Sequence, residues 1–137
     1  IANTITANEN YDAQLAQRLD ADDYGMKSYV FVILKSGDNK STDQEIRSKS
    51  FRGHMENMGR LVKQDKLILA GPFGKNDKDY RGLFILNVKT IEEAEALLET
   101  DPAISAGYLS AEMTPWYGSA AISEYLQASD KVWKIKP

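Results

Sequence analysis

The chain contains no cysteine and only one histidine among its 137 residues. Without cysteine, disulfides, thiolate catalysis and Cys-ligated zinc or iron–sulfur centres are excluded. A single histidine also excludes any metal site that takes two or three imidazoles from one chain. A site made only of carboxylates stays open, but no loop has the spacing of a calcium site. We therefore expect no metal and no cofactor.

Long apolar runs and an excess of positive charge are also missing. No segment approaches the roughly 20 apolar residues of a membrane-spanning helix. The 17 Lys and Arg residues are outnumbered by 20 Asp and Glu residues, which gives a net charge of -3. This balance argues against a nucleic-acid partner and against docking on an anionic membrane. The remaining composition is typical of one globular domain.

The first residue is Ile1, not methionine. Removal of an export signal would explain this, and we favour an exported, periplasmic protein. A trimmed cytoplasmic protein is the alternative.

Hydrophobic periodicity predicts an alternation of helices and strands. The expected elements are a helix over 10–21, a strand over 26–35, a loop over 36–46, a helix over 47–66, strands over 67–71 and 82–88, a helix over 91–99, a strand over 108–116 and a helix over 119–128. Between the two outer helices the order is β-α-β-β-α-β. This order predicts an α+β domain of the ferredoxin-like class, with one antiparallel sheet and both core helices on one face.

Two surfaces need a partner. In the first helix, Tyr11, Leu15 and Leu19 form an apolar stripe that predicts packing on the main body. In the strand over 26–35 both alternating residue sets are apolar, so both of its faces should be covered. One layer of helices covers one face. We expect a second sheet, obtained by dimerisation, to cover the other.

His54 is the first candidate for chemistry. On a helical wheel it lies roughly 60° from Phe51, on or beside the apolar stripe of its helix. An imidazole can give or take a proton near neutral pH. A buried histidine bonded to one backbone carbonyl is the alternative, and the helix alone favours that alternative.

Asp101 is the second candidate. The spacing of the helix over 91–99 brings it to the buried side, where a carboxylate could orient an imidazole. Asp101 before Pro102 is also a good N-cap for a short turn over 102–106. The two interpretations are compatible.

Two further segments are candidates for ligand binding. Gly71, Pro72 and Phe73 lack the spacing and the following helix of a phosphate loop, so we expect them to end a strand at the mouth of a pocket. Trp116 could form a wall of that pocket, with a core or interface role as the alternative.

Taken together, these segments resemble the YCII-related family, including its relatives named for an Asp-Gly-Pro-Phe motif. The resemblance covers roughly 26–117, with 1–25 and 118–137 as extensions. It depends on His54, on the strand end Ala70-Gly71-Pro72-Phe73, on Asp101-Pro102 followed by Ala106-Gly107, and on Pro115-Trp116. The chain has Ala70 where the motif has an acid, so no role of that acid is carried over.

The resemblance implies a dimeric α+β barrel with two sheets face to face. It also implies an active site made of a His and an Asp, which map onto His54 and Asp101. One kind of relative removes HCl from a chlorinated hydroxyquinol, and fold relatives include muconolactone isomerases and cofactor-free monooxygenases. The shared theme is proton transfer on small cyclic or aromatic compounds.

Three hypotheses of function follow. The first is a lyase or isomerase in which Asp101 holds His54, with a pocket bounded by Phe73 and Trp116. The second is a small-molecule binding or sensing module that uses the same pocket without turnover. The third is an interaction role carried by the two extensions.

Overall fold

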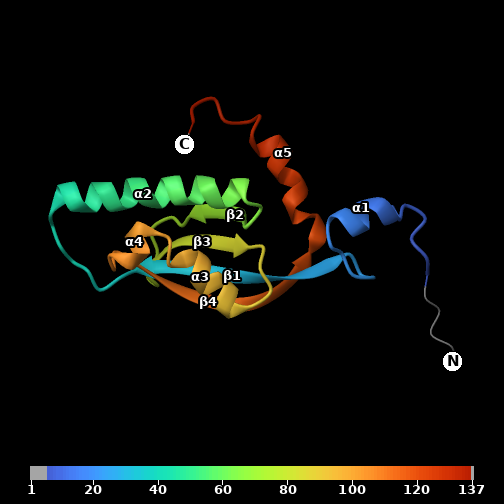
Figure 1. Cartoon of the computed structure of the whole chain (residues 1–137), viewed down its shortest axis with the longest axis horizontal. Coiled ribbons are helices and arrows are strands. Elements are labelled where there is room, and N and C mark those ends of the chain that lie inside the picture. Colours follow the sequence, from blue (N-terminus) through green and yellow to red (C-terminus); the bar gives the residue numbers. More distant parts are fainter. Residues whose placement is uncertain (1–5, 137) are drawn as a thin grey trace.

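A four-stranded antiparallel sheet with the strand order β2-β3-β1-β4 forms the centre of the molecule (Figure 1). The structure is a computed structural model and describes residues 6–136, so the first five residues of the expected extension lie outside it. The strands are β1 (Met26–Ser36), β2 (Leu67–Pro72), β3 (Tyr80–Leu86) and β4 (Leu109–Ser119). This order confirms the predicted ferredoxin-like α+β fold.

Both core helices, α2 (Gln44–Lys63) and α3 (Ile91–Leu98), pack on one face of the sheet, as predicted, and the short helix α4 (Pro102–Ser105) packs there with them. Val30, Val32 and Leu34 of β1 point into the same buried cluster as Leu61 of α2 and Leu98 of α3. Burial of such side chains stabilises the fold by roughly 1.5–3 kcal/mol each.

Helix α2 begins three residues earlier than predicted. The carboxylate of Asp43 accepts hydrogen bonds from the amides of Glu45 (3.1 Å) and Ile46 (3.2 Å). Asp43 therefore acts as the N-cap, and the helix forms over residues that had been assigned to a loop.

The opposite face of the sheet is partly covered by the C-terminal segment of the same chain. This segment forms the 3₁₀ helix η1 (Ala120–Glu124) and α5 (Tyr125–Ser129). Ile122 and Leu126 pack over the buried side chains of Tyr29, Ile68 and Ile85. The expectation that a second sheet alone would cover this face was therefore wrong for this part of it. Dimerisation through the rest stays a prediction.

The N-terminal helix α1 (Ala13–Arg18) is shorter than predicted and buries no residue. The predicted packing of its stripe was wrong, because the side chains of Tyr11 and Leu15 are exposed. The cap at Asp12 and the left-handed backbone of Asp20 (φ 58°) limit the helix to a length that cannot present a long stripe. Polar contacts hold this region instead, among them an ion pair between Arg18 and Glu124 at 3.1 Å.

Strands β1 and β4 pair over their full length, from Met26 opposite Ser119 to Ser36 opposite Leu109. Strand β4 thus continues three residues beyond the predicted end. Across residues 6–136, no helix is both long and apolar enough to cross a membrane.

Candidate functional site

The imidazole of His54 lies between helix α2 and the sheet. Its ring stands edge-on to Phe51, with centroids 6.2 Å apart, and roughly parallel to Phe84 of β3, with centroids 6.1 Å apart. The side chain is 12% exposed, so it is largely buried but reachable by solvent. Aromatic walls on two sides restrict the orientation of the ring.

Asp101 is almost completely buried, with 1% of its side chain exposed. Its Oδ1 accepts hydrogen bonds from the amides of Ala103 (2.9 Å) and Ile104 (3.4 Å), so it is the N-cap of α4. Pro102 occupies the first helical position, where a missing N–H is harmless. The N-cap role predicted from the sequence therefore holds, and it uses only one of the two carboxylate oxygens.

The second oxygen meets the imidazole. Nδ1 of His54 lies 2.5 Å from Oδ2 of Asp101, so the two groups form a hydrogen bond. With Nδ1 donating its proton to the carboxylate, the neutral imidazole has its lone pair on Nε2. Nε2 has no hydrogen-bond partner among the described residues, and no buried polar side-chain atom there lacks a partner. Nε2 therefore keeps contact with solvent and is free to exchange a proton.

A close approach of two helices brings the pair together. Gly53, which precedes His54, faces Pro102, and a Cβ added to Gly53 would lie only 2.7 Å from Cγ of Pro102. The absence of a side chain at Gly53 thus lets α4 approach α2. A glycine inside a helical pattern is a sequence signal for such a contact.

A second polar contact links the same two segments. Asn57 is buried on α2, and its Oδ1 accepts hydrogen bonds from Thr100 at 3.0 Å and from Arg60. Because Thr100 directly precedes Asp101, this contact fixes the backbone from which the carboxylate projects. The partners come from distant parts of the chain, so spacing alone did not indicate it.

The predicted ligand-binding residues lie in two different parts of the sheet. Gly71 and Pro72 form the end of β2, and Phe73 packs on Tyr80 with ring centroids 5.6 Å apart. Trp116 packs on Tyr29 at 5.7 Å, on the face covered by the C-terminal segment. The structure does not bring Trp116 to His54, because the β1–β4 register places the two on opposite faces of the sheet. A pocket shared by His54 and Trp116 within one chain was thus a wrong expectation.

Hollows of about 280 Å³ and about 390 Å³ lie beside α2, and neither has His54 or Asp101 in its wall. The first, of about 280 Å³, includes Phe51 and therefore borders the residue that contacts the imidazole. Among residues 6–136, no three His, Asp or Glu side chains gather in a way that would hold a metal ion.

The family model described as the YCII-related domain matches residues 29–117, a range that includes His54 and Asp101. No curated protein matches the sequence. Among solved structures, one similar chain is the 5-chloro-2-hydroxyhydroquinone dehydrochlorinase TftG from Burkholderia phenoliruptrix AC1100, in complex with 2,5-dihydroxybenzoquinone. The two chains are 22% identical, with 64% of this chain and 92% of that chain covered and a TM-score of 0.44.

Proposed function

The chain belongs to the YCII-related family, and we propose that it is an enzyme that moves a proton on a small cyclic or aromatic molecule. His54 is the proton-transferring group, and Asp101 holds its ring. The observation that supports this proposal is the 2.5 Å contact between Nδ1 and a buried carboxylate, which leaves Nε2 available. Phe73 remains a candidate for ligand contact at the end of β2.

The chemistry begins at Nε2. Its lone pair takes a proton from an activated C–H bond of the substrate, and the electrons of that bond form a new double bond. In a lyase a leaving group departs as an anion from the adjacent carbon. In an isomerase the imidazolium returns the proton to a different carbon. In both, Asp101 stabilises the positive ring, and such a positioned base contributes about 10²–10⁴-fold to the rate.

Deuterium exchange tests this proposal without knowledge of the product. Wild-type protein is first screened by thermal shift against small hydroxylated aromatics, cyclic enols and lactones. Compounds that bind are then incubated with protein in D₂O and examined by mass spectrometry for carbon-bound deuterium or for product. We expect exchange with wild type and with the control Glu56→Gln, an exposed neighbour on α2, and none with His54→Gln. Equal exchange by His54→Gln would rule the proposal out.

Binding without turnover is the second candidate. It is favoured by the observation that His54 lines neither of the two hollows, because a ligand held in either of them would not touch Nε2. His54 would then transfer no proton to the ligand. Compounds that stabilise wild type but show neither exchange nor product would support this candidate over the enzyme.

A further inference from the structure

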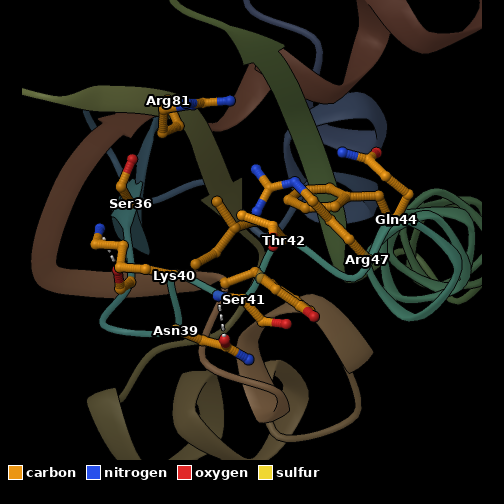
Figure 2. Close-up of a pocket in the computed structure, with 12 residues that line it drawn as sticks. Ser36, Asn39, Lys40, Ser41, Thr42, Gln44, Arg47 and Arg81 are labelled. Carbon is orange, nitrogen blue, oxygen red and sulfur yellow. Dashed lines mark hydrogen bonds between the residues drawn. The ribbon is translucent and has the colours of Figure 1, made fainter.

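The hollow of about 280 Å³ at the start of α2 has an unusual charge (Figure 2). It is formed by the loop between β1 and α2, the first turns of α2, one residue of β3 and the start of β4. Its wall carries the three cations Lys40, Arg47 and Arg81 and no carboxylate. In a chain with a net charge of -3, this is a local concentration of positive charge.

Arg47 is held in place by two aromatic rings. Its guanidinium carbon lies 5.1 Å from the ring centroid of Phe51 and 5.2 Å from that of Tyr108. Such cation–π contacts use the face of the guanidinium group and leave its N–H edge available. Within residues 6–136, the Arg47 side chain takes part in no hydrogen bond or ion pair. Its N–H groups are therefore available to donate two parallel hydrogen bonds to a planar carboxylate.

The other cations reach the hollow from different elements, with Arg81 on β3 and Lys40 on the loop after β1 (Figure 2). Arg81 has no ion-pair partner in the described part of the chain. Nζ of Lys40 donates to the carbonyl of Gly37 at 2.8 Å and has further donors to offer. Three acids lie beside the hollow. Asp38 and Asp43 are each flanked in sequence by lining residues, and Asp79 accepts a hydrogen bond from the lining residue Ser36 at 2.9 Å. The lining residues themselves include cations and no carboxylate.

The position of the hollow relates it to the His54 pair. Arg47 and His54 are seven residues apart on α2, so they lie on nearly the same side of the helix, with a rise of roughly 10 Å between them. Phe51 lies between the two and contacts both. We infer that the hollow binds the carboxylate of a small organic acid whose ring extends along Phe51 toward His54. The link to His54 rests on the proposed function, whereas binding of the carboxylate does not.

Sodium benzoate is the probe for this inference, with benzamide as its neutral counterpart and inorganic phosphate as a second anion. Binding is measured by calorimetric titration at low and high salt. We expect benzoate to bind, benzamide to bind at least tenfold more weakly, and added salt to weaken benzoate binding. Arg47→Gln and Arg81→Gln should each weaken benzoate binding by about 10–100-fold, as expected for loss of a hydrogen bond to a charged group.

Arg52→Gln is the matched control, because it removes the same charge from α2 at an exposed position outside this hollow. Benzoate binding that is absent, or equally weakened by Arg52→Gln, would overturn the inference. Tighter binding of phosphate than of benzoate would overturn the assignment to a carboxylate. If benzoate binding depends on Arg47 while His54→Gln still exchanges deuterium, the carboxylate site is supported and the proposed function is ruled out. If His54→Gln loses exchange but benzoate binding does not depend on Arg47, the carboxylate site is ruled out and the proposed function is supported.

Discussion

At the scale of single residues, Asp101 has two tasks that can be separated. One carboxylate oxygen caps α4 and the other holds His54. Asparagine keeps a cap oxygen but places an amide donor beside Nδ1, which forces the proton of the neutral ring onto Nε2. Alanine removes both contacts. The two substitutions should therefore differ in stability while both impair chemistry.

We expect Asp101→Asn to lose about 10²–10⁴-fold in deuterium exchange with a small change in stability. Asp101→Ala should lose as much exchange and also about 2–4 kcal/mol in the free energy of unfolding, because the cap and a buried partner are both gone. Urea unfolding and the exchange assay measure the two effects. Equal stability of the two variants would show that Oδ1 does not cap the helix.

A second residue-scale contact lies far from His54. The hydroxyl of Tyr117 donates to Asp22, whose carboxylate also accepts from the amides of Met26 and Tyr24. These bonds, first the one from Tyr117, lower the pKa of Asp22 below its ordinary 3.8. The same bond raises the pKa of Tyr117 above its ordinary 10.0. The contact therefore contributes stability at neutral pH.

The sign of this contribution fixes its pH window. A lowered carboxyl pKa gives stability that is present above pH 3.8 and is lost as the pH falls through the lowered value. A raised tyrosine pKa gives stability that is present below pH 10.0 and is lost as the pH rises through the raised value. Tyr117→Phe should thus be less stable than wild type at neutral pH, with a difference that shrinks in acid. Urea unfolding at neutral pH and at acidic pH measures the difference in the free energy of unfolding, with the exposed Tyr11→Phe as control. A difference that grows in acid would contradict it.

At the scale of elements, the approach of α4 to α2 is open to test through two glycines of the same helix. A Cβ at Gly53 would meet Pro102, whereas a Cβ at Gly59 would have no atom within 4 Å. Gly59→Ala should stabilise the protein by about 0.5–1 kcal/mol through helix propensity. Gly53→Ala should lose this gain to steric overlap and destabilise by about 1–2 kcal/mol.

The displaced α4 in Gly53→Ala should also separate Asp101 from His54 and reduce deuterium exchange, whereas Gly59→Ala should exchange normally. Thermal unfolding and the exchange assay report on the two consequences. If both alanines stabilise and both exchange like wild type, Gly53 has no part in positioning the pair.

Much of the element pattern was predictable, because the apolar periodicity of the core strands and helices is strong. The order of elements and the capping box of α3, with Thr90 bonded to the amide of Glu93 at 3.2 Å, follow the sequence. The start of α2 was missed because apolar periodicity begins later than the cap at Asp43. The length of α1 was overestimated because three spaced apolar residues looked like a packing stripe.

The candidate site was predictable only in part. Helix periodicity places His54 and Asp101 on the buried side, and the structure brings them together. Their contacts with Phe84 and Asn57 depend on sheet register and helix approach, which no local pattern encodes. The face of Trp116 could have been inferred, because it continues the polar set of β4, Ser110, Glu112 and Thr114, and not the apolar set that ends with Met113.

At the scale of the whole molecule, part of the sheet face opposite the helices remains open. The open patch consists of Phe31, Ile33, Leu69 and Leu83, which are half-buried or exposed. Ile33 packs against neither buried cluster. We propose that the chain forms a dimer of face-to-face sheets and that this patch is the surface that the dimer uses.

Ile33→Glu should therefore convert a dimer into a folded monomer, because a carboxylate buried in the interface has no partner. Ile46→Glu, at an exposed position on α2, serves as the control and should leave the dimer intact. Sedimentation velocity measures the assembly state. A monomeric wild type, or a dimer that tolerates Ile33→Glu, would remove this interface.

The pairing of the first strand with the last has a practical consequence. Residues near Met26 and Ser119 are neighbours only in the folded chain, because β1 and β4 are far apart in sequence and pair with each other in the sheet. The chain has no native cysteine, so two introduced thiols could be labelled there without competition. A donor and an acceptor dye at these sites would report closure of the sheet in single-molecule fluorescence, and mixing labelled with unlabelled copies would separate folding from association.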